Sequence, residues 1–181
     1  GSEGTYTLNG GTLEATTLTT GNGTAVYNFN SGTVDVSTFA KPITNSGSTI
    51  QVRSTTSATD FNNASGTLKL GIQGNSTSDL FDVSGTFTAG DTLEVTLDNG
   101  YIPSTENYYS WDVIDWGTLS GTFSTVTLPS LTSGLAWDTS ALYTTGTLST
   151  QLDNSPNEDG DAFINENDPF PYIASKTTSN V

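Results

Sequence analysis

TYTLNGGTLEA (residues 5–15) recurs 21 residues later as VYNFNSGTVDV (residues 26–36). The second copy keeps the tyrosine, the asparagine and the Gly-Thr pair at the same spacing, and leucines are replaced by other apolar residues. Three later segments share the end of this pattern, in which a small residue and Thr precede apolar, polar and apolar residues. They are STIQV (48–52), GTLKL (66–70) and DTLEV (91–95).

The alternation at the end of each copy predicts β-strands with one apolar face, because successive side chains of a strand point to opposite sides. The apolar positions are Leu13 and Ala15, Val34 and Val36, Ile50 and Val52, Leu68 and Leu70, and Leu93 and Val95. Each unit is too short to be stable alone, but units that return about every 20 residues can stack and share one interior. Turn sequences such as TGNG and IQGN separate the units. The pattern therefore predicts an all-β chain built as a β-solenoid.

The solenoid hypothesis makes a specific prediction for the first two copies. Asn9 and Asn30 should stack and form a hydrogen bond along the axis, Leu13 and Val34 should be buried, and Glu14 and Asp35 should lie outside. A β-sandwich is the alternative, since its strands also recur with turns between them. It would place residues 5–15 and 26–36 antiparallel or in different sheets.

The composition excludes several classes of function. The chain has 181 residues, with 19 acidic residues against four basic ones and a net charge of −15. Binding to nucleic acid through its phosphates is therefore not expected. No run of about 18 apolar residues is present, so membrane insertion is not expected either. The absence of His and Cys excludes histidine general bases, thiol nucleophiles and the usual zinc ligands.

The segment from residue 78 to 129 resembles the C-terminal part of bacterial autotransporter passenger domains. The residues that carry this resemblance are Asp79-Leu80, Val83-Ser84-Gly85-Thr86, Asp91-Thr92-Leu93, Pro103 and Ser120-Gly121-Thr122-Phe123. The preceding copies, and the stretch GLAWDTSALYTTGTLST (134–150), resemble the autotransporter-associated β-strand repeats of large secreted bacterial proteins. The resemblance covers about residues 4–150 and implies a right-handed parallel β-helix of an extracellular or cell-surface protein.

We expect three regions along the chain: solenoid coils in residues 1–100, an aromatic-rich β cap of the same domain in residues 101–150, and an acidic tail in residues 151–181. The end of a solenoid exposes apolar interior and must be covered. Trp111 and Trp137 are expected to be buried in this cap. The other interpretation of the aromatic residues is a platform on which sugars stack, with Tyr108 and Trp116 as the candidate residues.

The tail contains NEDGDAFINEND (157–168), in which oxygen ligands recur at positions 1, 3, 5, 7, 9 and 12. They are Asn157, Asp159, Asp161, the carbonyl of Phe163, Asn165 and Asp168. Six or seven oxygens at such spacing suit Ca²⁺, and the stretch resembles a calcium-binding repeat of the thrombospondin type-3 kind. It departs from that repeat in its first ligand, which is Asn, and in Ala162 at position 6. A solvated acidic linker is the alternative.

Asp79, Asp82 and Asp91 are close enough in sequence to suggest paired carboxylates for acid–base chemistry, although turn and strand-end roles explain them equally well. We expect a non-enzymatic extracellular structural or adhesive module that self-associates, by head-to-tail stacking or strand donation, into filaments. The alternative is a carbohydrate-binding accessory module of a secreted polysaccharide-degrading enzyme that binds surface glycans. A polysaccharide lyase is a third and weaker hypothesis.

Overall fold

The computed structural model describes residues 3–19 and 23–153, and this part of the chain is all β. Its strands are β1 (Glu3–Leu18), β2 (Thr24–Phe39), β3 (Ile43–Gln51), β4 (Thr55–Ala58), β5 (Phe61–Gly74), β6 (Thr77–Ser78), β7 (Leu80–Ala89), β8 (Thr92–Leu97), β9 (Ser110–Asp112), β10 (Ile114–Gly121), β11 (Thr125–Thr127), β12 (Leu135–Asp138) and β13 (Thr147–Leu152). None of these residues forms a helix that is long and apolar enough to cross a membrane.

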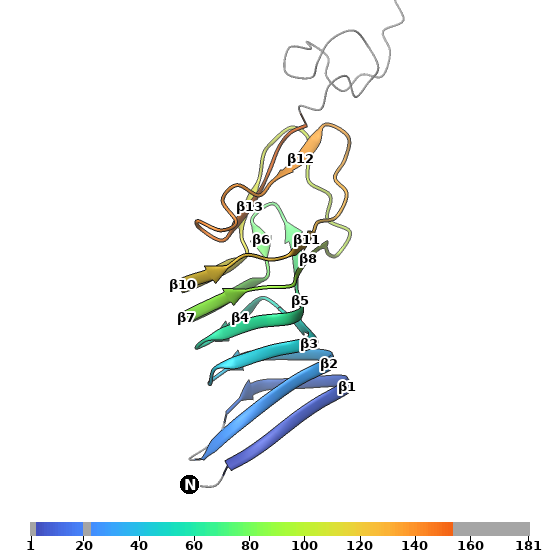
Figure 1. Ribbon diagram of the computed structural model, residues 1–181. Coiled ribbons are helices and arrows are strands. Elements are labelled where there is room, and N and C mark those ends of the chain that lie inside the picture. The colour runs from blue at the N-terminus through green and yellow to red at the C-terminus, as the bar shows by residue number, and fades with distance from the viewer. Residues whose placement is uncertain (1–2, 20–22, 154–181) are drawn as a thin grey trace, which may run out of the picture.

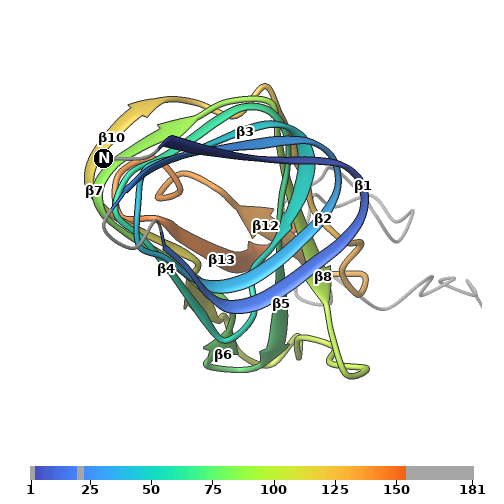
Figure 2. The ribbon, with the colours of Figure 1, turned by 90° about the horizontal axis from the view of Figure 1, so that it is seen from below.

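Ten strands form one sheet whose pairings are parallel, except for the short antiparallel pair β5–β6. One ladder runs from β1 through β2, β3, β5 and β8 to β11, and a second runs from β2 through β4 and β7 to β10. Figure 1 shows the strands stacked in layers from the N-terminus upward. Seen along the stack, they follow one another around a ring (Figure 2).

A row of threonines runs through the first ladder and shows its register. Thr12 pairs with Thr33, and the row continues through Thr49, Thr67 and Thr92 to Thr125. Segments 5–15 and 26–36 are therefore parallel neighbours in one sheet, as predicted. This is opposite to the antiparallel pairing that the sandwich alternative predicted for them.

The apolar face of this ladder lines the interior of the ring. Val34, Ile50, Leu68 and Leu93 lie in register and are fully buried. Leu13, which pairs with Val34, is only half-buried, because β1 is the first layer and no strand lies beyond it in the described chain. Its predicted burial is thus correct only in part.

A column of phenylalanine rings fills the rest of the interior. The ring of Phe61 lies 6.4 Å from that of Phe39, 4.8 Å from that of Phe81 and 6.1 Å from that of Phe87. All four rings are at most 1% exposed. Burial of each such side chain contributes about 1.5–3 kcal/mol, so this column is a main source of stability.

Asparagines join the layers at the corner that precedes the threonine row. The side-chain Nδ2 of Asn30 donates to Oδ1 of Asn9 at 2.9 Å, which confirms the predicted stacking of these two residues. Asn45 donates to Asn63 at 2.8 Å, in the opposite direction along the stack, and both are fully buried. The corner also needs glycine: Gly66 has φ +106°, and a Cβ there would lie 2.5 Å from the carbonyl oxygen of Ser48.

A separate three-stranded antiparallel sheet, in the order β12–β13–β9, lies at the C-terminal end of the stack. In the view along the stack, β12 and β13 lie across the ring (Figure 2). Trp111 on β9 is 2% exposed, and its Nε1 donates to the carbonyl of Gly74 at 2.7 Å. The Trp137 ring lies 5.8 Å away but is only half-buried. The predicted burial is confirmed for Trp111 and holds in part for Trp137.

Candidate functional site

The outward side of the first ladder carries a row of polar side chains. We call it the polar row: Glu14, Asp35, Gln51, Lys69 and Glu94, which pair in register across five strands. Lys69 forms an ion pair with Glu94 in the next layer. Asp35 does not lie fully outside as predicted, since its side chain is 23% exposed and is paired with Arg53.

A hollow of about 650 Å³ opens where strands β3, β5 and β8 of this ladder end. We call it the Arg53 groove, and its walls come from the turn between β3 and β4, from the hairpin β5–β6 with the residue that follows it, and from the loop after β8. Its lining residues are Arg53, Ser54, Thr55, Gln73, Thr77, Ser78, Asp79, Asp98 and Asn99. All of them are polar, and the volume is within the range of small-ligand sites, about 300–1,000 Å³.

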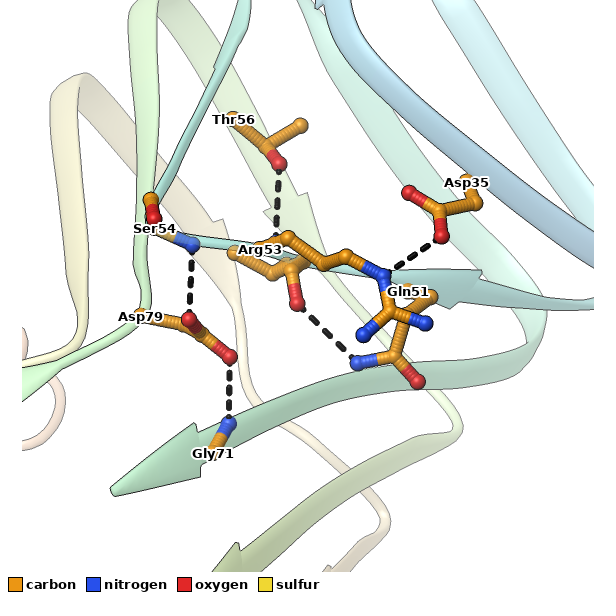
Figure 3. Close-up of polar contacts among 8 residues, drawn as sticks. Asp35, Gln51, Arg53, Ser54, Thr56, Gly71 and Asp79 are labelled. Carbon is orange, nitrogen blue, oxygen red and sulfur yellow. Dashed lines mark hydrogen bonds and ion pairs between the residues drawn. The ribbon is translucent and has the colours of Figure 1, made fainter. Parts of the chain in front are cut away.

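Arg53 is the most exposed charged group of the groove. Its Nε donates to Oδ2 of Asp35 at 2.5 Å, while its side chain remains 68% exposed (Figure 3). The hydrogen bond and the charge of Asp35 raise the pKa of Arg53 above its ordinary value, with smaller contributions from Asp79 and Glu14. A guanidinium has five N–H donors, and within residues 3–19 and 23–153 only Nε of the Arg53 guanidinium has a hydrogen-bond partner. The two Nη groups are therefore available to a ligand.

Asp79 forms the floor of the groove and holds its backbone. This carboxylate is 5% exposed and accepts hydrogen bonds from the backbone N–H groups of Ser54 at 2.7 Å and Gly71 at 2.8 Å. It also accepts one from Nε2 of Gln73 at 3.1 Å. These bonds keep Ser54 at φ +51°, a conformation that is uncommon for residues other than glycine.

The three aspartates considered for acid–base chemistry serve different parts of the chain. Asp79 binds the turn at Ser54, and Asp91 accepts a hydrogen bond from the backbone N–H of Gly66. Asp82 is exposed on β7 and pairs in register with Asp115 of β10. Asp79 and Asp91 thus have structural roles in which their oxygens are already occupied.

The candidate sugar-stacking residues occupy different environments. Tyr108 is 55% exposed in the segment before β9. Trp116 is half-buried, and its ring stacks on Phe87 at 6.4 Å with an interplanar angle of 22°. The ring contacts found in the described part of the chain do not join Tyr108 to Trp116. The structure therefore does not bring them together as one platform.

The calcium hypothesis concerns Asn157, Asp159, Asp161, Phe163, Asn165 and Asp168, which lie outside the described residues. Within residues 3–19 and 23–153, no three His, Cys, Asp or Glu side chains are grouped so that they could hold a metal ion.

The Arg53 groove was not predicted from the sequence, where Arg53 counted only as one of four basic residues. One signal could have identified it. In the stacked repeats Asp35 is the equivalent of Gln51, and Arg53 follows Gln51 by two residues. Aligning the repeats therefore puts an acid and a base near the same end of two adjacent strands.

Comparisons of this chain with protein-family models, with curated proteins and with solved structures found no match.

Proposed function

We propose that this chain is a non-enzymatic structural or adhesive module of an extracellular or bacterial cell-surface protein, built as a right-handed parallel β-helix. The observation that carries the proposal is the threonine row, in which six layers pair residue for residue in parallel. In a solenoid, each turn of the chain contributes a strand that pairs in parallel with the equivalent strand of the next turn. The connection between parallel strands is right-handed in nearly all sheets.

The proposed role follows from what the fold contributes physically. A stack of layers grows in one dimension and presents long polar sides, which suits a spacer or an adhesive surface. Asp79 and Asp91 use their carboxylates to fix backbone turns, a structural role that is consistent with a non-enzymatic module. The resemblance to autotransporter-associated repeats supports the extracellular location.

We further propose that self-association uses the open edge of β1. This strand of 16 residues pairs only with β2 in the described chain, and most of its residues are exposed. An unpaired strand edge offers its N–H and C=O groups to a strand of another chain. At the other end of the stack, the sheet β12–β13–β9 covers the interior. A strand donated to β1 by the next copy would extend the assembly into a filament.

Electron microscopy and light scattering of the purified protein test this proposal. We expect concentration-dependent filaments or oligomers, and we expect Leu13→Lys to abolish them, because the half-buried Leu13 would then bring a charge into the contact. Thr118→Lys is the control, since Thr118 is exposed on β10, away from β1. Monodisperse monomers at high concentration, or assembly that Leu13→Lys leaves unchanged, would contradict the use of this edge.

A further inference from the structure

A second, shallower hollow extends the Arg53 groove along the stack. It measures about 360 Å³ and is lined by Glu14, Ala15, Thr16, Asp35 and Ser37. Arg53 lines the first hollow and Asp35 lines the second, and these two residues form an ion pair. Together they run from β1 across β2, β3 and β5 to the loop after β8. Parallel strands lie about 4.8 Å apart, so this path is about 19 Å long, and its shape suits an extended ligand better than a compact one.

The walls of the groove present hydrogen-bond donors and acceptors side by side. The Nη groups of Arg53 are donors, and the carboxylate of Asp98 is an acceptor. The amide of Asn99 offers both kinds of group, as do the hydroxyls of the Ser and Thr residues in the wall. A hydroxyl of a ligand also donates and accepts. A ligand chain with many hydroxyls can therefore form hydrogen bonds with the donors and acceptors of these walls.

The charges of the groove argue against an anionic ligand. Arg53 is its one basic residue, and Asp35 already pairs with that base. Asp79 and Asp98 add two carboxylates to the wall, and the whole chain carries a net charge of −15. An acidic polymer would meet more negative than positive charge along the whole path. The chemistry of the lining thus favours a ligand without charge.

The groove is held in shape by buried contacts and by an unusual backbone. The buried Asp79 fixes Ser54 and Gly71, which come from two different layers. Ser54 and Asn99 have positive φ values of +51° and +56°, and both line the hollow. The conformation is uncommon for serine, and at Ser54 the hydrogen bond to the buried Asp79 imposes it. The backbone of the groove at Ser54 and Gly71 is therefore positioned before a ligand arrives, which reduces the entropy lost on binding.

We propose that the Arg53 groove and its extension bind a segment of an uncharged oligosaccharide. The sugar hydroxyls bind to Arg53, Asp98 and Asn99, and the chain continues past Asp35 and Glu14 of the polar row. This site is distinct from the exposed ring of Tyr108, and its extension ends on β1, the strand whose edge is used for self-association. It adds a ligand to the proposed structural module, and it does not depend on filament formation.

Titration of the ¹⁵N-labelled protein, followed by NMR, tests the site directly. The probes are cellohexaose, xylohexaose and chitohexaose as uncharged chains, and hexagalacturonate as an anionic chain. We expect at least one uncharged hexamer to shift the amide signals of Ser54, Gln73 and Asn99 at millimolar concentration or below. The signals of β12 and β13 should not move.

Variants then separate the groove from other surfaces. Arg53→Ala should weaken binding at least tenfold, and the protein should still fold, because this side chain is 68% exposed. Lys41→Ala is the matched control, since it removes one positive charge from an exposed residue outside the groove. Tyr108→Ala tests the aromatic alternative, and both control variants should bind like the parent protein.

Three outcomes would overturn the proposal. They are the absence of any shift with all uncharged hexamers, a preference for hexagalacturonate, and loss of binding in Tyr108→Ala with Arg53→Ala unaffected. A protein that binds the glycan but stays monomeric would contradict only the self-association proposal. A filament that binds no glycan would contradict only the groove.

Discussion

The side-chain amide of Asn30 donates a 2.9 Å hydrogen bond to the side-chain oxygen of Asn9, which precedes it by 21 residues. A similar bond, in which the earlier residue Asn45 donates to Asn63, lies two layers further on, and there both side chains are fully buried. In addition, Nδ2 of Asn63 donates to the carbonyl of Gly90 at 2.7 Å. One type of residue thus links the layers at this corner, in solvent at the first contact and in the interior at the second.

The burial of the asparagines predicts unequal effects of substitution. Asn63→Ala removes the acceptor of Asn45 and leaves the carbonyl of Gly90 without this donor, so it should lower the free energy of unfolding by about 1–3 kcal/mol. Asn9→Ala should cost less than about 1 kcal/mol, because water replaces the lost bond at an exposed site. Urea unfolding measures both values. Equal costs for the two variants would contradict the importance of burial.

The cap predicts a difference between its two tryptophans. Trp111→Ala removes a ring that is 2% exposed together with its hydrogen bond to Gly74, and it should destabilise the protein by about 3–5 kcal/mol. Trp137→Ala should cost less, since that side chain is half-buried. Thermal unfolding followed by far-ultraviolet circular dichroism checks the order. A larger loss of stability for Trp137→Ala would show that Trp111 is not the main contributor to the stability of the cap.

The corner glycine gives a test of backbone geometry. Gly66→Ala places a Cβ 2.5 Å from the carbonyl oxygen of Ser48 in the neighbouring layer, at φ +106°, so the layers must move apart and stability should fall by more than about 1 kcal/mol. Gly4→Ala is the matched control, because nothing lies within 4 Å of a Cβ there. We expect its melting temperature to be unchanged or slightly higher. Similar melting temperatures for the two variants would contradict the close approach of the layers at Gly66.

The layered architecture was predictable because one physical pattern repeats. Thr12 and Thr33 are 21 residues apart, and the later threonines follow after 16, 18 and 25 residues; the structure pairs all of them in one row. The alternation around each threonine sets which side chains face inward, since shifting a strand by one residue would move them to the other face. Local sequence therefore determines the register of this ladder.

The site was not predictable, because its parts come from irregular segments between the regular ones. The groove forms where the hairpin β5–β6 and the loop at Asp98 and Asn99 extend beyond the ring, and these insertions have no counterpart in the first two layers. Nor does the sequence show that Asp79 is buried beneath Ser54, which precedes it by 25 residues. Only the folded chain shows which carboxylate holds a turn and which one faces solvent.

The environment of Asp112 leads us to expect that the stability of the protein depends on pH. Partial burial and the nearby charge of Asp115 raise the pKa of this carboxyl above its ordinary value of 3.8. The folded state therefore holds this proton more tightly than the unfolded state, and the stability that it contributes is lost as the pH rises through the raised pKa. Asp112→Asn should accordingly make the protein more stable than the parent at pH 7, with the difference disappearing below about pH 3.9. Chemical unfolding across this pH range measures the difference, and a variant that is less stable than the parent at pH 7 would contradict the direction of the shift.

The last prediction concerns the acidic segment 157–168, which lies outside the described residues and which we propose as a Ca²⁺ site. Asp159, Asp161 and Asp168 repel one another, and a bound Ca²⁺ would remove this repulsion through several oxygen ligands. If Ca²⁺ binds to the folded protein alone, mass action must raise the melting temperature as the ion concentration increases. We therefore expect a chelator to lower the melting temperature or to dissolve assemblies, and Asp161→Ala to have the same effect in the presence of calcium.

Asp115→Ala, which removes an exposed carboxylate elsewhere, should leave the response to calcium intact. Calorimetry that detects no heat of binding at millimolar Ca²⁺, together with an unchanged melting temperature, would identify the segment as an acidic linker.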